Sequence, residues 1–555
     1  MALKHVSVLI AGGGPAGLSL AADLGWRGHD CLLAEELQTA SDHPRATLLS
    51  ARSMEFFRRW GLDEAVLDAG LPRDYLYEIV FATRLSGHVL RKLTFVSAHD
   101  FLTNSVALAA TLPDARWSPY YKTQIGQQAL EPVLRRFAGG FNNVALRHGW
   151  RLASFEDRGT EVIATLVDVA SGREERVTAD YLVGCDGGRS VVRSQLGIRY
   201  TGRGAIRPNV SFFFRSNEFW QTATVGRGTL YFLFNPESFG VFTAIDGREL
   251  WNYQHYFLDP TKATDNVDPY VALPEAMGRP FQFELLRTTH WHHHQSVATH
   301  FREGRVFLAG DAAHLFCPTG GMGMNTAIGD AMDLSWKLGA VLDGWGNDAL
   351  LDSYDIERRP VAVRNTIETA DNAGRIDNVM RDTPSDIEDD STAGELARQY
   401  VSERIRGIAK QFSTSGLALG YRYGQSPVVI ADGTPEPPDE PGVVHQSTWP
   451  GCRAPHAWLD DGRSTLDLFA HGGFTLLRLG AASPAGADLA AAAAQHRVPL
   501  RIETISEPDV CALYERRLVL VRPDGHVTWR GDTIDDVDAI VDAMRGRSSR
   551  VIAGV

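Results

Sequence analysis

The chain has 555 residues, of which 44% are hydrophobic and 22% charged, and its formal net charge is −13 at pH 7. This length exceeds the size at which one hydrophobic core stops growing, so two or three domains are expected. The acidic balance offers no basic face of the kind that a phosphate backbone demands, which argues against nucleic acid as a partner.

The spacing of the cysteines and the length of the apolar runs indicate the cellular compartment in which the protein is expected. The five cysteines are far apart and form no CxxC pair: Cys31, Cys185, Cys317, Cys452 and Cys511. This usage fits a reducing cytoplasm and disfavours a disulfide scaffold or a zinc site. The first apolar run is interrupted by glycines, and no segment offers about 20 uninterrupted apolar residues, so neither a signal peptide nor a membrane span is expected.

A dinucleotide-binding motif opens the chain. A buried strand is predicted over Val6–Ile10, and a glycine-rich turn and a helix follow it. Glycines are needed where the turn is tight, where the backbone approaches a pyrophosphate, and where the helix packs on the strand. The N-terminus of the helix then offers free N–H groups to phosphates. The predicted contacts are Gly12, Gly14, Pro15, Ala16 and Gly17.

An acidic residue follows the next predicted strand, Cys31–Ala34. Glu35 lies 18 residues beyond Gly17, where its carboxylate can accept hydrogen bonds from ribose hydroxyls. Glu36 is its neighbour, and a slip of one position leaves either residue able to make this contact. An acid here disfavours a 2′-phosphate, so the motif predicts FAD or NAD and excludes NADP from this site.

Two further strands end in an acid and glycines. The segment 181–184 precedes Asp186-Gly187-Gly188-Arg189-Ser190, and the segment 305–309 precedes Gly310-Asp311. An aspartate at such a strand end can bind a ribityl hydroxyl. Glycines over 318–323 allow backbone amides to face a flat ring, and the dipole of the following helix can stabilise negative charge on a reduced flavin.

These three segments, in this order, resemble the class A flavoprotein monooxygenases of the para-hydroxybenzoate hydroxylase fold. The stretches 43–61 and 310–338 are similar to the phenol hydroxylase branch, which includes chlorophenol and hydroxybiphenyl monooxygenases and polyketide hydroxylases. By this resemblance Arg45 contacts the FAD phosphates or ribityl chain, Gln127 contacts the flavin side, and the 186–193 motif serves both flavin and nicotinamide. The further contacts implied are Asp186, Gly187, Arg193, Asp311, Pro318, Gly320, Gly321, Gly323, Met324 and Asn325.

The expected architecture is α/β. It comprises a Rossmann-like FAD-binding domain, an inserted and mostly antiparallel β-sheet substrate domain, and a C-terminal thioredoxin-like domain that in this branch commonly supports dimer contacts. The FAD-binding domain is expected over 1–200, with substrate-domain segments at about 75–115, and again over 291–380. The other predicted parts are 201–290 (substrate sheet), 381–444 (helical or linker) and 445–555 (thioredoxin-like).

The resemblance implies hydroxylation of a phenolic or polyketide-type aromatic substrate through a flavin C4a-hydroperoxide. The reaction consumes O2, and NADPH or NADH binds transiently as the reductant. Thr47 and Leu48 follow the phosphate-contacting arginine, so no catalytic base is carried over from that position. Tyr231, Tyr253 and His255 are candidate bases, although each is more often an ordinary sheet residue.

Two alternatives share the cofactor motifs. One is a flavin-dependent epoxidase or Baeyer–Villiger-type tailoring enzyme, and the other is a non-catalytic flavin-binding sensor. No metal site is expected, although His290 and 292–294 form a histidine-rich stretch. Adjacent histidines on a strand point to alternate faces and cannot all reach one ion.

Overall fold

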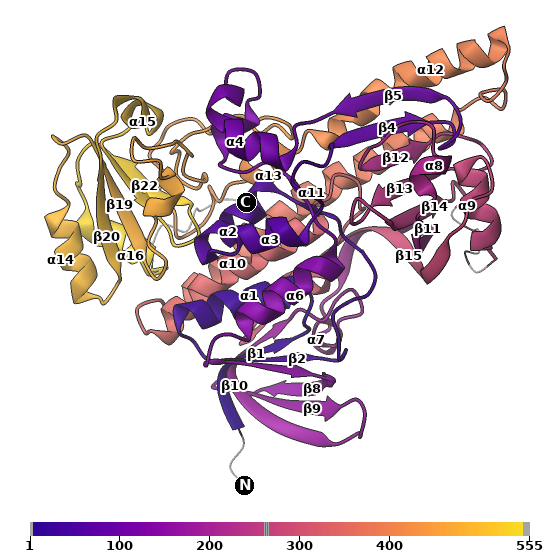
Figure 1. Cartoon of the computed structure of the whole chain (residues 1–555). Coiled ribbons are helices and arrows are strands. Elements are labelled where there is room, and N and C mark those ends of the chain that lie inside the picture. The colour runs from indigo at the N-terminus through magenta and orange to yellow at the C-terminus, as the bar shows by residue number, and fades with distance from the viewer. Residues whose placement is uncertain (1–3, 260, 262–263, 265, 548–555) are drawn as a thin grey trace.

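The computed structural model describes residues 4–259, 261, 264 and 266–547. Three large sheets lie side by side, as Figure 1 shows: a C-terminal sheet in yellow, a central sheet beneath α1 and α10, and a second mixed sheet with α8 and α9. Among the residues described, no helix is long and apolar enough to cross a bilayer.

The central sheet contains the predicted dinucleotide-binding strand. Its path is β16-β17-β10-β1-β2-β7, and β8 and β9 extend from β10. Its parallel members are β1 (Lys4–Ala11), β2 (Cys31–Glu35), β7 (Val144–His148), β10 (Glu174–Gly184) and β17 (Val306–Leu308). The antiparallel ones are β8 (Trp150–Asp157), β9 (Val162–Asp168) and β16 (Arg302–Glu303). The carboxyl ends of β1, β10 and β17 therefore meet at one edge, and the three predicted motifs follow those ends.

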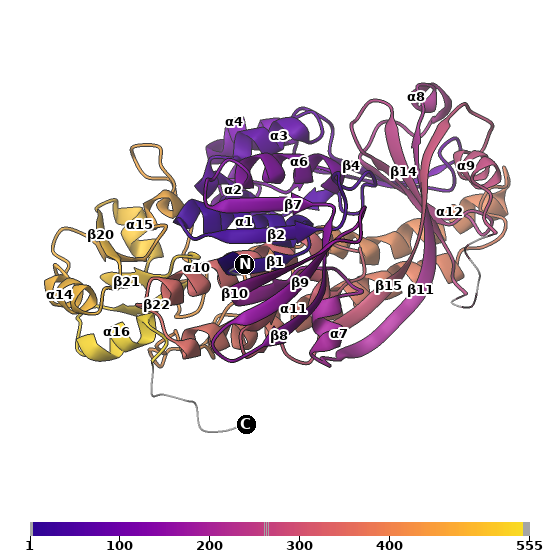
Figure 2. The ribbon, with the colours of Figure 1, turned by 90° about the horizontal axis from the view of Figure 1, so that it is seen from below.

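Helices cover this sheet. α1 packs against α10 and α6, and in Figure 2 α1 and α6 lie above β1 and β10. The helices of this region are α1 (Pro15–Arg27), α2 (Ala51–Trp60), α3 (Asp63–Ala69), α4 (Ala98–Leu108), α5 (Asp114–Trp117), α6 (Gln127–Ala138), α7 (Val191–Gln195), α10 (Gly323–Leu342) and α11 (Asp348–Arg381). Short elements between them are β3 (Leu48–Leu49), β6 (Thr123–Gln124), η1 (Gly310–Ala312) and β18 (His314–Leu315).

The second sheet has the order β18-β15-β11-β14-β13-β12-β4-β5 and is antiparallel except where β12 meets β4. Its strands are β4 (Glu78–Ala82), β5 (Val89–Thr94), β11 (Tyr200–Arg215), β12 (Leu230–Leu233), β13 (Gly240–Ala244), β14 (Leu250–Tyr256) and β15 (Glu284–Ala298). The predicted domain boundary between residues 290 and 291 falls inside β15, because this long strand pairs with β11 over nearly its whole length.

The two faces of this sheet differ. Because side chains alternate along a strand, Phe212 and Phe214 of β11 point to one face and Phe213 to the other. Phe212 and Phe214 join Trp251 in an aromatic core covered by α8 (Phe219–Thr222) and α9 (Pro269–Met277). The opposite face turns toward α11.

The C-terminal sheet has the order β20-β19-β21-β22. Its strands are β19 (Phe474–Leu479), β20 (Leu500–Ile505), β21 (Leu518–Val521) and β22 (Val527–Gly531), and its helices are α14 (Ala487–Gln495), α15 (Pro508–Leu513) and α16 (Val537–Met544). A parallel pair joined by a helix and followed by an antiparallel hairpin is the core of a thioredoxin-like fold, which confirms the prediction. The last helix, α16, begins after Asp536, whose side chain accepts a hydrogen bond from the backbone N–H of Ala539.

The segment between the sheets is partly helical. α12 (Thr392–Ile408), η2 (Ala409–Phe412) and α13 (Ser415–Leu419) precede a long irregular stretch that reaches η3 (Thr465–Leu468). α12 packs against α11 and β5, as Figure 1 shows. This segment therefore closes the outer side of the second sheet before the chain enters the C-terminal unit.

Candidate flavin site

The turn after β1 has the close approaches that the motif demands. Gly12 has a φ of +105°, and a Cβ there would lie 2.3 Å from the carbonyl oxygen of Cys185. A Cβ on Gly17 would lie 2.0 Å from the carbonyl oxygen of Gly12. By contrast, a Cβ on Gly14 would meet no atom within 4 Å, so the turn faces open space on that side. Gly14 is the N-cap of α1, and no side chain caps the helix there.

Glu35 ends β2 beside this turn. One carboxylate oxygen accepts a hydrogen bond from the backbone N–H of Gly13 at 2.5 Å, and the other accepts one from the N–H of Leu37 at 2.8 Å. The carboxylate is therefore fixed in place with lone pairs to spare for ribose hydroxyls. Glu36 is exposed and lies beyond the end of β2, whereas Glu35 contacts the glycine-rich turn, which favours Glu35 among the two acids considered.

Asp311 follows β17 at the edge where the three motifs meet. Asp311 is exposed to solvent, but the surrounding protein partly desolvates its carboxyl and raises the pKa, an effect that His314 and Arg45 oppose. The backbone carbonyl of Asp311 accepts a hydrogen bond from the Tyr200 hydroxyl at 2.6 Å. Gly310, with a φ of +60°, brings this strand end against Ala16 of α1. Asp311 thus lies next to the glycine-rich turn.

The loop before α10 has a glycine-dependent backbone conformation that suits the close approach of a flat ligand. Gly320 and Gly321 have φ values of +88° and +66°, which favour glycine. α10 begins at Gly323, and no side chain caps its N-terminus, so its first N–H groups and its positive dipole end face the site. Pro318 is exposed at the start of the loop, and Met324 is buried within the first turn of the helix.

Asn325 is a structural bracket of the site. Its amide nitrogen donates to the carbonyl oxygens of Leu48 (2.9 Å) and Gly321 (2.6 Å). Its amide oxygen accepts from the backbone N–H of Ser50 and the hydroxyl of Ser53, both at 2.7 Å. All four hydrogen-bonding positions of the side chain are therefore used within the protein. Asn325 holds the glycine loop against α2 and has no amide group left for the ring.

Asp186 and Arg193 likewise brace the second motif. Asp186 accepts hydrogen bonds from the Ser190 hydroxyl at 2.5 Å and from two backbone N–H groups at the start of α7. The Arg193 guanidinium donates to the Tyr200 hydroxyl at 2.7 Å and to the carbonyl oxygen of Ala312 at 3.3 Å. Arg193 therefore ties this loop to the Gly-Asp motif. Gly187, with a φ of +79°, faces open space.

Arg45 and Gln127 lie on two neighbouring segments that a backbone hydrogen bond joins. Arg45 is exposed, and the backbone N–H of Gln127 donates to the carbonyl oxygen of Ala46 at 2.8 Å. The Gln127 side chain donates to Glu131 at 2.7 Å. The backbone of Gln127 thus fixes the segment that carries Arg45, and the Arg45 side chain remains available to an anionic ligand.

The three candidate bases lie on the wrong face of the second sheet for contact with this site. Tyr231 and Tyr253 are fully buried in the aromatic core beneath α8 and α9. The Tyr231 hydroxyl donates to Gly226, and burial raises the pKa of both tyrosines well above the ordinary value. His255 shares this face, and burial lowers its pKa to about 4. A base that touches a substrate has to come from other residues.

The second sheet also has a face opposite the aromatic core. This face lies against the flavin site at two places. The Phe213 ring lies 6.3 Å from the ring of His43, two residues before Arg45. At the other end Cys317, the residue before Pro318, lies near Arg207 and Tyr256 of this face. This face carries polar residues at alternate positions of β11 (Arg207, Asn209 and Ser211), which the sequence analysis missed. Their alternation within an aromatic strand was the available signal.

The histidine stretch shows the alternation expected of a strand. His293 points to the face that meets Phe213, whereas His292 and His294 point to the other, with their rings 6.3 Å apart. Within the described part of the chain, no group of three or more His, Cys, Asp or Glu side chains is placed to hold a metal ion.

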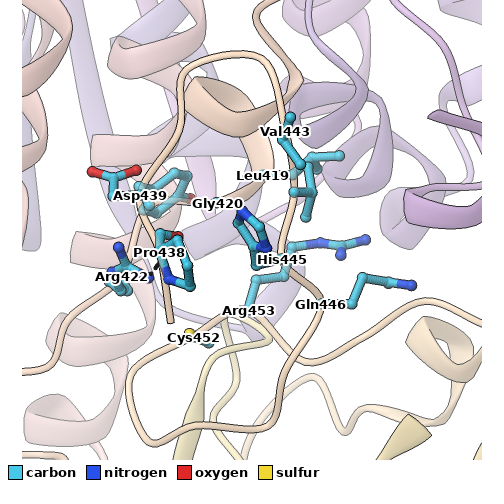
Figure 3. A pocket seen from close by; sticks show the side chains of 12 residues that line it. Leu419, Gly420, Arg422, Pro438, Asp439, Val443, His445, Gln446, Cys452 and Arg453 are labelled. Atoms are coloured by element: carbon cyan, nitrogen blue, oxygen red, sulfur yellow. Dashed lines mark hydrogen bonds between the residues drawn. The ribbon is translucent and has the colours of Figure 1, made fainter. Parts of the chain in front are cut away.

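A small pocket lies away from the motifs. Figure 3 shows it where the end of α13 at Leu419 and the irregular stretch at Val443 meet Arg453. Its volume is about 10 Å³, room for one water at most. Arg453 is held there by the buried carboxylate of Glu55 on α2 at 2.9 Å, so the pocket lies behind α2.

The residues present fit a flavin dinucleotide. The turn at Gly12–Gly17 is tight where packing requires it and open where a pyrophosphate would lie. Neither α1 nor α10 has a side-chain cap at its N-terminus, the two helices pack against each other, and α10 contacts the turn that carries Asp311. Carboxylates stand at the ends of β2 and β17. The fold and site therefore define a dinucleotide-binding flavoprotein.

Comparison with known proteins narrows this class. The FAD binding domain family model matches residues 5–369, and the aromatic-ring hydroxylase C-terminal model matches residues 447–548. The chain belongs to the class A FAD-dependent aromatic hydroxylases. It is thus an enzyme that uses FAD, which confirms the family, the fold class and the cofactor expected from the motifs.

Relatives match along almost the whole chain. A tetracenomycin B2 monooxygenase-dioxygenase of Streptomyces olivaceus is 33% identical, with 98% of each chain covered. A 4-methyl-5-nitrocatechol 5-monooxygenase of a Burkholderia species is also 33% identical, over 98% of this chain and 97% of the relative. Among solved structures, RebC with bound 7-carboxy-K252c has a TM-score of 0.88 at 37% identity, covering 99% of this chain and all of RebC.

Proposed function

We propose that the chain hydroxylates a polycyclic phenol or a related polyketide-type aromatic compound, with O2 as the oxygen donor and NADPH or NADH as the reductant. The observation that carries this proposal is the face of the second sheet that runs from His43 to Cys317, lined by Phe213, Trp291 and Tyr256. Flat aromatic walls of this length suit a flat substrate of several rings. Support also comes from relatives named for tetracenomycin and from an aklavinone-11 hydroxylase structure with FAD and aklavinone, at 31% identity and a TM-score of 0.82 over 99% of this chain and all of the hydroxylase.

Each part of the site has an assigned task. FAD, when bound, supplies the oxygen-activating chemistry. Backbone N–H groups at Gly14 and the start of α1 would bind the pyrophosphate, and Glu35 would accept hydrogen bonds from the ribose. Asp311 would orient the ribityl chain, and Arg45 would contact the phosphates or the ribityl chain. The N-terminus of α10 would supply positive potential to the ring, where negative charge develops on reduction.

Water exclusion falls to the apolar lining. Phe213, Trp291 and Cys317 surround the substrate side of the site with groups that cannot hydrate a reactive oxygen species. The nicotinamide reductant approaches the loop at Asp186–Arg193, where Gly187 faces open space. Arg193 ties this loop to the Gly-Asp motif through the carbonyl oxygen of Ala312.

The decisive experiment is a screen of hydroxylated naphthalenes, anthracenes and anthraquinones for stimulated NAD(P)H oxidation. With isotopically labelled dioxygen, mass analysis should find one labelled oxygen atom in the aromatic product. Stimulated oxidation that yields only hydrogen peroxide across the whole panel would reject hydroxylation of this substrate class. A labelled lactone or epoxide would favour the Baeyer–Villiger or epoxidase alternative.

We further propose a homodimer in the cytoplasm. The thioredoxin-like unit supports dimer contacts in the resembling branch, and the five cysteines, Cys31, Cys185, Cys317, Cys452 and Cys511, form no disulfide among the residues described. Sedimentation velocity on the FAD-loaded protein tests the dimer, and a single monomeric species at micromolar concentration would reject it.

A further inference from the structure

Three side chains on one face of the second sheet are buried with polar groups left over. Arg207 is 4% exposed, and Asn209 and His293 are fully buried. In the strand register Arg207 lies opposite His293, and Asn209 lies opposite both Trp291 and Tyr256. The Arg207 guanidinium stacks 4.3 Å above the Tyr256 ring, which confirms that these residues share the face.

Their hydrogen-bonding capacity is largely unused. Within the described chain, neither the amide oxygen nor the amide nitrogen of Asn209 has a partner, and neither ring nitrogen of His293 has one. Nε and Nη2 of Arg207 also have no hydrogen-bond partner within the described chain, while Nη1 donates to Asp377 of α11. Buried polar groups are nearly always paired, so a cluster of three such side chains needs an explanation.

The cluster is placed beside the flavin loop. Arg207 lies near Cys317, the residue before Pro318, and the ring of Phe213, farther along the same strand, lies against the ring of His43. His293 stacks on Trp291 at 5.0 Å between ring centres and meets Tyr256 edge-on at 5.7 Å. Aromatic walls therefore flank the polar groups, an arrangement that suits a flat ligand with a polar edge.

The donors define the chemistry of that edge. Nε and Nη2 form the side-on edge of the guanidinium, where two parallel N–H groups match two neighbouring oxygen atoms. Asp377 balances one positive charge, but Arg203 and Arg381 also act on its carboxylate, so the surroundings keep a positive excess. An ionised pair of oxygens fits this field better than a neutral or cationic group.

We propose that Arg207, Asn209 and His293 form the polar recognition end of the substrate chamber and select a polycyclic aromatic ring bearing two adjacent oxygens that share a negative charge. A carboxylate and an ionised hydroxy-carbonyl pair both have this chemistry. The inference rests on the proposed function, because it assigns the orientation of the same aromatic substrate. These residues position the substrate and take no part in oxygen transfer.

The test measures binding to the FAD-loaded enzyme through quenching of tryptophan fluorescence. The probes are alizarin, which carries a hydroxy-carbonyl pair, anthracene carboxylate, and anthracene, which carries no oxygen. At least one oxygen-bearing probe should bind about tenfold or more tighter than anthracene, because the site rejects a ring that leaves its donors unpaired. The preferred probe identifies the oxygen pair. Similar affinities for all three probes would overturn the proposal.

Asn209→Leu and His293→Leu supply the matched variants. Each should reduce the preference for the oxygen-bearing probe to about threefold or less while leaving the melting temperature unchanged or raised, since a buried group without a partner is removed. His292→Leu, on the same strand but the opposite face, should keep the preference. Arg207→Met should also lose it, although Asp377 then loses its partner.

A lowered melting temperature with the preference intact in both leucine variants would show that the cluster is merely structural. The proposed function is scored separately on the same preparation, by product analysis with labelled dioxygen. Selective binding without hydroxylated product would reject the function and keep the recognition cluster, and hydroxylation with no selectivity would do the reverse.

Discussion

The guanidinium of Arg522 and the carboxylate of Glu357 form a two-bond ion pair, with N–O distances of 2.6 and 2.8 Å, in which neither side chain is exposed. Arg522 directly follows β21 of the C-terminal unit, and Glu357 belongs to α11 of the flavin-binding region. Lys337 of α10 also donates to Glu357 at 2.5 Å, and Asp524 accepts from Arg522 at 2.8 Å. A buried charge network therefore attaches the thioredoxin-like unit to the two helices behind the flavin site.

Arg522→Met should destabilise the protein strongly. Removing one partner of a buried ion pair leaves the other charges uncompensated, which costs about 3–5 kcal/mol of the free energy of unfolding. Urea denaturation of the FAD-loaded protein measures it. Arg516→Met is the matched control, since its pair with Asp532 is exposed and contributes about 0–1 kcal/mol. Equal effects of the two substitutions would contradict the structural role of the network.

Asn325→Leu should weaken FAD binding, although Asn325 has no amide group left to contact the cofactor. The substitution removes four hydrogen bonds that hold the glycine loop against α2 and leaves the buried N–H of Ser50 without its acceptor. The expected loss of FAD affinity is about tenfold to a hundredfold. Ser53→Ala removes one of the four bonds and should give a smaller loss. An unchanged FAD dissociation constant in Asn325→Leu would show that the bracket does not shape the site.

Asp311→Ala should lose FAD from the purified protein. The carboxylate at the end of β17 is proposed to bind the ribityl chain, and a hydrogen bond to a charged group is worth about 1.5–3 kcal/mol, or roughly tenfold to a hundredfold in affinity. Flavin absorbance relative to protein absorbance reports the occupancy after gel filtration. Stoichiometric yellow holoprotein from Asp311→Ala would disprove the assignment.

Glu35→Ala should have a milder effect on FAD affinity, and Glu35→Gln a milder one still. The alanine variant loses both the proposed ribose contact and the acceptor for the N–H of Gly13, whereas glutamine keeps an acceptor oxygen. Fluorescence titration of the apoprotein with FAD measures both. The ribose assignment fails if alanine leaves the dissociation constant unchanged.

Acid should destabilise the fold through His456. Burial, reinforced by Arg453, lowers the pKa of this histidine to about 3. The folded state thus holds it neutral, while the unfolded chain takes up a proton below about pH 6.5. Its contribution is complete above pH 6.5 and is lost as the pH falls, by about 2 kcal/mol at pH 5. His456→Gln should show a shallower loss of stability between pH 6.5 and 5, and His99→Gln, at an exposed position, should match the wild type.

The strand, turn and helix at the flavin site could be predicted because each depends on local residues. The glycines at 12–17 and the acids at the ends of β2 and β17 follow from the requirements of a tight turn and a strand end. Parallel strands then bring their carboxyl ends to one edge, which explains why three motifs far apart in sequence meet.

The substrate side could not be predicted in the same way. Phe212, Phe213 and Phe214 give β11 aromatic residues on both faces, so the sequence does not say which face turns inward, and a shift of one residue exchanges them. Tyr231 and Tyr253, the candidate bases, lie in the aromatic core beneath α8 and α9, on a face that the sequence alone does not distinguish from the other. The bracket at Asn325 and the pair of Arg522 with Glu357 join residues far apart in the chain, which no local pattern reveals.

Titration of the apoprotein with FAD tests the central claim most directly, because every assigned task depends on one flavin held by the ends of β1, β2 and β17. The expected result is a single high-affinity site per chain, with the bound flavin's visible spectrum perturbed on addition of alizarin or anthracene carboxylate. Binding of FAD at less than stoichiometric level, or with no change of its spectrum on addition of any aromatic probe, would contradict the account.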